Sequence, residues 1–137
     1  MIAEQSFECS VETIREVRKW IADTLAGERT PRDIVEGILL AASEAVTNAV
    51  VHGYEKSRRG RVDVRIQVAV DSIAITVRDY GTGFGRKPYT PPDTSVPHEG
   101  GYGVFLLRNL MDDVKVTTHE DGTEVHMVKA LKPGIAS

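Results

Sequence analysis

The sequence predicts an α+β two-layer sandwich, in which helices pack on one face of a mixed, largely antiparallel sheet. From residue 14 to residue 50, apolar residues recur every three or four positions, which indicates amphipathic helices. In residues 62–79 and 114–131, apolar and polar residues alternate, which is typical of half-buried strands. The period changes after the basic stretch at residues 56–61, which is expected to be a solvated loop, with a phosphate or partner patch as the alternative.

Length and composition limit the class of protein. A chain of 137 residues with 41% hydrophobic residues suits a single domain, residues 1–137, with one mostly aliphatic core. The formal net charge of −3 argues against nucleic acid or an anionic membrane as the main partner. Cys9 is the single cysteine, so neither an internal disulfide nor a Cys-rich zinc site is expected. The sequence shows no signal peptide or membrane-spanning segment, and we therefore expect a cytoplasmic protein.

The first elements along the chain are a short strand and a helix. Residues 4–9, EQSFEC, form a candidate edge strand. Ser10 is the expected N-cap of a helix whose apolar stripe runs to Leu25, and Gly27 is expected to end that helix.

The second helix carries the first candidate site. Thr30 as N-cap and Pro31 as first helical residue would begin this helix, which is expected to stop at about residue 53. Glu44 and Asn48 lie one turn apart at the margin of its apolar arc, without a charged neighbour on the helix. Such a pair costs free energy unless a divalent ion or a reacting hydroxyl uses it. The alternative is an ordinary amphipathic helix with two polar residues at its waterline.

The two central strands end in the second candidate site. The first strand is expected to bury Val62, Val64, Ile66, Val68 and Val70, and Asp71-Ser72 to form a tight turn. On the next strand the core-facing row ends in Asp79, and a buried carboxylate must be hydrogen-bonded. Gly81 and Gly83 follow and would let the backbone approach whatever Asp79 holds. The alternative is a strand end at which Asp caps a glycine turn.

The last third of the chain contains a lid and a hairpin. Residues 84–100 hold four of the six prolines without periodicity, as a functional lid or a disordered segment would. They close on GGYG, residues 100–103, which opens a helix; glycines there would expose N–H groups to a phosphate, or only make a turn. The closing hairpin is expected to turn at Asp121-Gly122, with Thr123 on the inner face of its second strand.

Three stretches in this order carry a resemblance to a known family: SEAVTNAVVHGY (43–54), RDYGTGF (78–84) and EGGYGVFLLRNLMDDV (99–114). The arrangement resembles the Bergerat-type ATPases, the superfamily of the gyrase, heat-shock chaperone and histidine-kinase ATP domains. Within that superfamily it resembles the bacterial anti-sigma factor serine kinases closely. The resemblance covers nearly the whole chain, and its first stretch is the most specific because Glu44, Asn48, His52 and Gly53 all match the family spacing.

The resemblance implies a role for each matching residue at the reacting end of the nucleotide. Asn48 would hold the Mg²⁺ that bridges the phosphates of ATP, as suits a neutral oxygen donor facing a hard cation. Glu44 would be the general base for the attacking serine hydroxyl. The helix start at Gly101, Tyr102, Gly103 and Val104 would meet the phosphates, with closure of the lid excluding water.

At the other end of the nucleotide, Asp79 would accept the adenine amino group. Gly81 and Gly83 would let the base approach, and Thr123 would help to hold it through water. His52 is expected to pack and bond to backbone rather than to act in catalysis.

The chain departs from its apparent relatives in the lid. Relatives usually carry an arginine just before the second glycine box, where this chain has His98 and Glu99. Arg86 or Lys87 at the other end of the lid would be the substitutes. ATP binding therefore rests on more matching residues than phosphoryl transfer does.

Three functions are compatible with the sequence. The first is an ATP-dependent serine kinase that phosphorylates a small anti-sigma antagonist and sequesters a sigma factor. The second is a nucleotide-binding partner-switching module without kinase activity. The third, the detached ATP domain of a histidine kinase, is disfavoured because no phosphoacceptor helix pair precedes the fold. The resemblance also implies a homodimer, for which the edge strand at residues 4–9 offers a means. No direct contact with nucleic acid or membrane is expected, because the net charge is negative.

Overall fold

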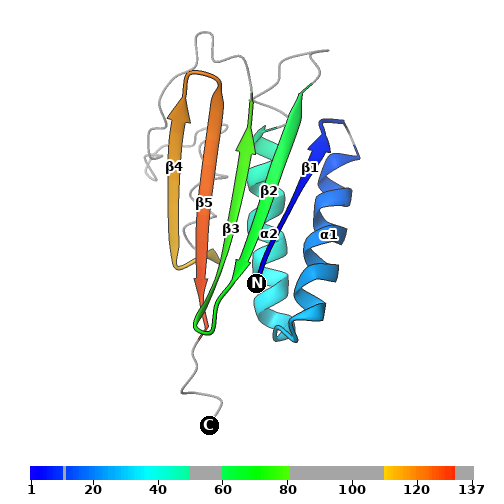
Figure 1. Ribbon diagram of the computed structural model, residues 1–137, viewed down its shortest axis with the longest axis vertical. Coiled ribbons are helices and arrows are strands. Elements are labelled where there is room, and N and C mark those ends of the chain that lie inside the picture. Colours follow the sequence, from blue (N-terminus) through cyan, green and yellow to red (C-terminus); the bar gives the residue numbers. More distant parts are fainter. Residues whose placement is uncertain (11, 50–59, 81–109, 132–137) are drawn as a thin grey trace, which may run out of the picture.

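The computed structural model describes residues 1–10, 12–49, 60–80 and 110–131 (Figure 1). Within these ranges the elements follow the predicted order of one strand, two helices and four strands. Their bounds are β1 Ile2–Glu8, α1 Thr13–Gly27, α2 Arg32–Asn48, β2 Arg61–Val68, β3 Ser72–Asp79, β4 Asp113–His119 and β5 Gly122–Ala130. Of the described helices, none has the length and apolar character needed to cross a membrane.

The described strands form one sheet in the order β1-β2-β3-β5-β4, and each pair in that order is antiparallel. Helices α1 and α2 lie side by side against one face of this sheet (Figure 1). The predicted α+β two-layer sandwich is therefore confirmed. The sheet was expected to be mixed, but the described strands pair only in antiparallel fashion. For β2–β3 and β4–β5 this follows from the tight turns that join them, since short turns reverse the chain direction.

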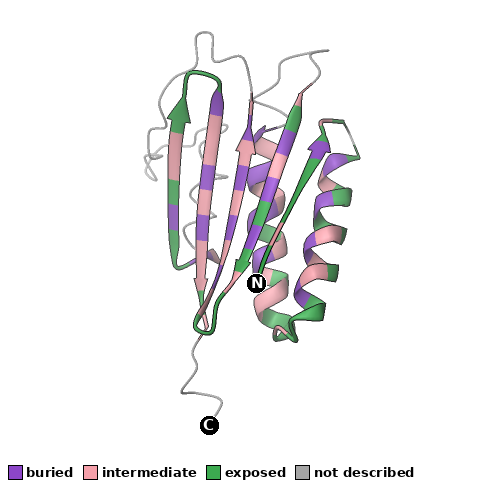
Figure 2. Ribbon diagram, in the orientation of Figure 1, coloured by how far each residue is buried: buried purple, intermediate pink, exposed green. Residues whose placement is uncertain are grey.

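The core lies between the sheet and the two helices. Buried residues alternate with more exposed ones along β2 and β3, as a period of two requires (Figure 2). On β2 and β3 the fully buried residues are Val62, Val64, Ile66, Ile73 and Ile75. They face Ile21 and Leu25 of α1 and Ile38, Ala42 and Val46 of α2, all without exposed surface. Aliphatic side chains thus fill the interior, as the composition predicts.

The predicted edge strand at residues 4–9 is confirmed, because β1 pairs only with β2 among the described strands. Phe7 is the buried residue of β1, and its ring meets Trp20 of α1 edge-on, with 5.9 Å between the ring centroids. Helix α1 ends at Gly27 as predicted, but Ser10 is not its N-cap. The fully buried Thr13 explains the later start, because its hydroxyl donates to the carbonyl of Glu8 at 2.8 Å and ties the helix to the end of β1.

Helix α2 begins one residue later than predicted. Pro31 is its N-cap residue and has an extended ψ of 143°, so the helical backbone starts at Arg32. Arg18 of α1 joins the two helices by donating to the hydroxyl of Ser43 at 2.7 Å. Residues 50–59, into which the helix was predicted to continue, lie outside the described residues.

Both described hairpin turns lie one residue earlier than the sequence predicts. The amide of Ala69 donates to the carbonyl of Ser72 at 2.9 Å, so the β2–β3 turn consists of Val70 and Asp71. Val70 is therefore 92% exposed, and its predicted burial is wrong. In the second hairpin His119 pairs with Gly122, which places Glu120 and Asp121 in the turn and Gly122 at the start of β5.

The architecture brings three chain segments to one end of the molecule. The end of α2, the end of β3 and the β4–β5 turn all lie at the same end of the sheet (Figure 1). Helix α2 packs against both β3 and β5. The residues that the sequence singles out in the described part of the chain, Glu44, Asn48, Asp79 and Thr123, come from these three segments.

Candidate functional site

Asp79 is a buried carboxylate at the end of β3. Its side chain continues the core-facing row of Ile73, Ile75 and Val77, and the residue is only 5% exposed. The backbone N–H of Thr123 donates to Asp79 Oδ1 at 3.2 Å. The predicted burial of this carboxylate and its need for a hydrogen-bond donor are therefore confirmed. Because a carboxylate has about four lone-pair positions, it can also accept a donor from a ligand.

Gly122 explains how β5 comes so close to Asp79. Its φ of +145° belongs to a region that side chains avoid. A Cβ built on Gly122 would lie 1.9 Å from the carbonyl oxygen of Asp79, a distance that no real structure tolerates. The sequence suggests a turn as the reason for this glycine, whereas the structure shows that the close approach of two strands requires it.

Thr123 follows Gly122 on β5 and shares the inner face with Val125 and Met127, as predicted. Thr123 is half-buried, while Val125 and Met127 are buried. The hydrogen bond from Thr123 to Asp79 joins two strands that are far apart in the sequence. The structure thus brings together the two residues that the resemblance assigns to the base.

Glu44 and Asn48 are half-buried on the last turns of α2. Ser43 and Thr47, their neighbours in sequence, donate their hydroxyls to backbone carbonyls of the helix at 2.7 Å. Within the described part of the chain, the side chains of Glu44 and Asn48 make no hydrogen bond or ion pair. The predicted pair without a local partner is confirmed, and its amide oxygen is available to a hard cation.

A magnesium ion would have few protein ligands here. Among the described residues no three His, Cys, Asp or Glu side chains cluster in a way that could hold a metal. Mg²⁺ suits such a site because it is commonly held by one or two protein oxygens together with phosphates and water. Asn48, whose side chain bonds to none of the described residues, fits this requirement.

The remaining predicted site residues lie outside the described residues. These are Gly81, Gly83, Gly101, Tyr102, Gly103 and Val104, together with His52 and the lid at residues 84–100. Their assignment stays a prediction.

Cys9 lies close enough to Asp79 to feel its charge, and the sequence predicts no role for it. Its amide donates to the carbonyl of Gly60 at 2.8 Å, so it extends the pairing of β1 with β2. Burial, together with the negative charge of Asp79, raises the pKa of the Cys9 thiol to about 11. The parity of β1 is the signal that could have found it, because Cys9 shares the face of Phe7.

Cys9 is therefore expected to react slowly with alkylating reagents. Only the thiolate reacts, and raising the thiol pKa from 9.0 to about 11 lowers its fraction near neutral pH by about 100-fold. The measurement is the rate of iodoacetamide labelling against pH in folded protein and in concentrated urea. The rate in the folded protein should reach half its maximum near pH 11. A half-maximum at the same pH in both states would contradict the shift, whereas simple shielding would lower the rate without moving the midpoint.

Comparison with known proteins identifies the family of this chain. The family model of the histidine kinase-like ATPase domain matches residues 7–129. The chain is 39% identical over 107 residues to the serine-protein kinase RsbW of Bacillus subtilis, and the match covers 72% of this chain and 66% of that protein. It is 32% identical over 138 residues to the serine-protein kinase RsbW of Staphylococcus aureus, covering 94% of this chain and 86% of that protein.

Solved structures give the same picture. The RsbU and RsbW domains of a Mycobacterium tuberculosis protein align with a TM-score of 0.73 at 20% identity, over 97% of this chain and 33% of that one. At this identity the likeness shows the fold. The histidine kinase domain of a blue-light activated kinase from Erythrobacter litoralis aligns with a TM-score of 0.57 at 26% identity, over 74% of this chain and 46% of that one. The chain therefore belongs to the histidine kinase-like ATPase family and, within it, to the family of the RsbW serine-protein kinases.

Proposed function

We propose that the protein is an ATP-dependent serine kinase of the anti-sigma factor type. Its substrate would be a small anti-sigma antagonist. When that antagonist is unavailable, the kinase would hold a sigma factor instead. The observation that carries the proposal is the buried carboxylate of Asp79, which accepts from the N–H of Thr123 at the end of the sheet where α2, the helix that carries Glu44 and Asn48, also ends (Figure 1). RsbW kinases with 32–40% identity to this chain support the assignment.

Asp79 reads the base in this proposal. An ionised carboxylate only accepts hydrogen bonds, so it favours the amino group of adenine over the oxo group that guanine carries at the same position. Burial of Asp79 strengthens the preference for adenine. A base without a donor at this position would leave a buried carboxylate oxygen without a hydrogen bond, which costs free energy. The N–H of Thr123 holds Asp79 Oδ1 in place, and this keeps the acceptor oriented before the base arrives.

Glu44 and Asn48 act at the other end of the nucleotide. Asn48 would hold a magnesium ion, which when bound neutralises charge on the phosphates. Glu44, one turn earlier on the same helix face, would accept the proton of the attacking serine hydroxyl. Its carboxylate has no partner in the described part of the chain that would compete for that proton.

The remaining parts of the proposal concern assembly and location. The exposed edge of β1 would allow a second copy to pair with the sheet, giving a homodimer. The protein would work in the cytoplasm on protein partners rather than on nucleic acid. A module that binds nucleotide without transferring phosphate is the second candidate, favoured by His98 and Glu99 at the place where relatives carry a lid arginine.

The function is tested by incubating the protein with γ-labelled ATP, magnesium and a purified small antagonist protein encoded beside it or beside a sigma factor. Label on a serine of the antagonist, identified by mass spectrometry and absent when magnesium is chelated, is the expected result. Retained ATP binding without transfer to the antagonist would favour the binding module. Failure to bind ATP with magnesium would overturn both candidates.

A further inference from the structure

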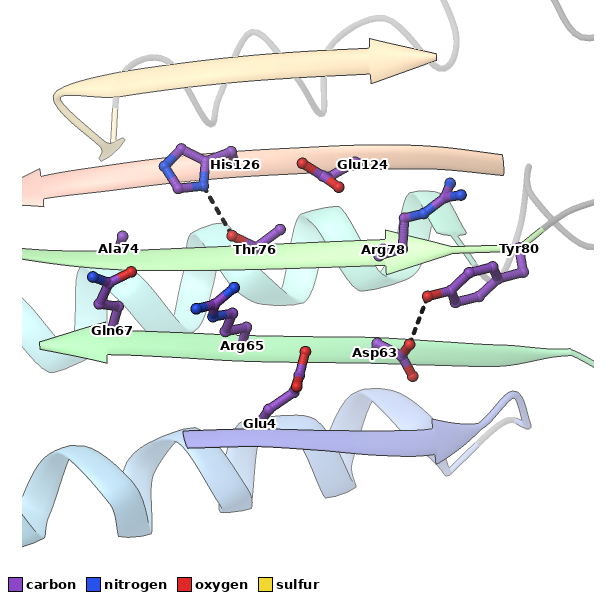
Figure 3. Close-up of a pocket in the computed structure, with 10 residues that line it drawn as sticks. All are labelled: Glu4, Asp63, Arg65, Gln67, Ala74, Thr76, Arg78, Tyr80, Glu124 and His126. Atoms are coloured by element: carbon purple, nitrogen blue, oxygen red, sulfur yellow. Dashed lines mark hydrogen bonds between the residues drawn. The ribbon is translucent and has the colours of Figure 1, made fainter. Parts of the chain in front are cut away.

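A polar cluster lies on the sheet face that the helices leave uncovered, at the end of β3. It consists of Arg61, Asp63, Arg78, Tyr80 and Asp121, and we refer to it as the Tyr80 cluster. Three of its members, Asp63, Arg78 and Tyr80, line a pocket on that face (Figure 3). Tyr80 directly follows Asp79, so the cluster and the buried carboxylate lie on opposite sides of the same strand end.

Tyr80 is held from three directions. The guanidinium carbons of Arg61 and Arg78 lie 4.5 and 4.6 Å from the centre of its ring. Its hydroxyl donates to Asp63 Oδ2 at 2.7 Å, as the dashed line in Figure 3 marks. Two cation–π contacts and a charge-assisted hydrogen bond restrict the motion of the Tyr80 ring far more than the ring of an ordinary surface tyrosine is restricted.

Arg78 connects the cluster to Asp79. Its Nη2 donates to Asp121 Oδ1 at 2.7 Å, and its Nη1 donates to the backbone carbonyl of Asp79 at 3.0 Å. The Arg78 side chain is only 16% exposed. The hydrogen bond with Arg78 also holds the pKa of the Asp121 carboxyl below its ordinary value, so this anchor keeps its charge to lower pH than an ordinary aspartate does. Asp79 is thus held by its carbonyl from one face of the sheet and by its carboxylate from the other.

We propose that Arg78 is a positioning residue for purine recognition, because it fixes the peptide plane from which the Asp79 carboxylate is presented to the base. The inference rests on the proposed role of Asp79 in accepting the adenine amino group. The direction of the Asp79 side chain follows from the orientation of its backbone, and hydrogen bonds depend steeply on angle. Without Arg78, the 3.2 Å bond from Thr123 would have to orient the carboxylate with one constraint fewer.

Arg65 provides a matched control. It lies on β2, lines the same pocket and is exposed (Figure 3). Among the described residues its guanidinium makes no hydrogen bond or ion pair. Replacing Arg65 removes the same charge from the same face as replacing Arg78, without touching the backbone of Asp79.

The test compares two ligands that differ only in the group that Asp79 would read: ATP and purine riboside triphosphate, which has hydrogen in place of the 6-amino group. Calorimetry gives the ratio of their affinities for wild type, Arg78→Met, Arg65→Met and Asp79→Asn. In Asp79→Asn the amide oxygen would take the place of Oδ1 and accept from Thr123. The amide NH₂ would then stand where the second carboxylate oxygen was. Because NH₂ cannot accept a hydrogen bond from adenine, the preference for ATP should vanish. We expect Arg78→Met to reduce the preference by about 10-fold, the size of one misaligned hydrogen bond. Arg65→Met should leave it unchanged.

The affinity for purine riboside triphosphate separates a positioning role of Arg78 from a merely structural effect. If Arg78→Met weakens both ligands equally, or leaves the preference intact while Asp79→Asn abolishes it, the positioning role is overturned and the proposed function stands. If Asp79→Asn keeps the preference, the reading of adenine by Asp79 fails, and the role of Arg78 fails with it. Should Arg78→Met not fold, as judged by circular dichroism, Asp121→Ala removes the acceptor that anchors Arg78 and leaves Arg78 itself in place. It should lower the preference in the same direction by a smaller factor, and an unchanged preference would overturn the inference.

Discussion

Replacing Glu44 by glutamine is expected to lower the rate of phosphoryl transfer by at least about 100-fold, the usual contribution of a general base. Glutamine keeps the shape and the helix propensity of glutamate but cannot accept the proton of a serine hydroxyl at neutral pH. ATP binding should change little, because the general base is not expected to hold the nucleotide. The measurement is single-turnover transfer of labelled phosphate to the antagonist, with ATP affinity determined separately on the same preparation.

Glu36→Gln is the matched control for this change. Glu36 lies two turns earlier on α2, is exposed and forms an ion pair with Arg32 at 3.7 Å. Losing such a surface pair should affect neither transfer nor binding, since exposed pairs contribute little. Transfer by Glu44→Gln within a factor of about three of wild type, far below the effect of losing a general base, would exclude Glu44 as the base.

Replacing Gly122 by alanine is expected to cost about 3 kcal/mol of unfolding free energy, through a disfavoured backbone conformation and a backbone clash. The φ of +145° disfavours any side chain. The new Cβ would approach the carbonyl oxygen of Asp79 to 1.9 Å, and Arg78 Nη1 to 2.8 Å. Because backbone cannot turn aside as a flexible side chain can, β3 and β5 must separate. ATP affinity should fall as well, since the separation moves Asp79 away from Thr123.

Gly37→Ala is the matched control for stability. A Cβ on Gly37 would meet nothing within 4 Å, and Gly37 lies inside α2. There, alanine is expected to stabilise the protein by about 0.5–1 kcal/mol, because glycine has the poorer helix propensity. Urea denaturation of both variants measures the change in unfolding free energy, which should be a decrease for Gly122→Ala and an increase for Gly37→Ala. A Gly122→Ala protein as stable as wild type would show that β3 and β5 do not need their close approach.

Several features of the fold could be read from the sequence because they depend on local periodicity. The inward parity of Ile73, Ile75 and Val77 predicted the burial of Asp79, and helical spacing placed Glu44 beside Asn48. The hairpin turns were each displaced by one residue, because the position of a turn depends on which residues pair across the two strands. This displacement changed the predicted burial of one residue, Val70, which is exposed.

The sequence by itself determined the core-facing parity of the helices and of the strands up to their turns. It also singled out four polar side chains of the described residues as candidates for a function: Glu44, Asn48, Asp79 and Thr123. Only the tertiary structure decided which of them meet. The order β1-β2-β3-β5-β4 places β5 beside β3, so that Thr123 reaches Asp79 across 44 positions of sequence. It also assembled the Tyr80 cluster from β2, β3 and the β4–β5 turn. Periodicity in the sequence predicts the neighbours of a residue along its own helix or strand. Contacts between elements depend instead on strand order and on how closely two backbones can approach, as β5 approaches β3 at Gly122.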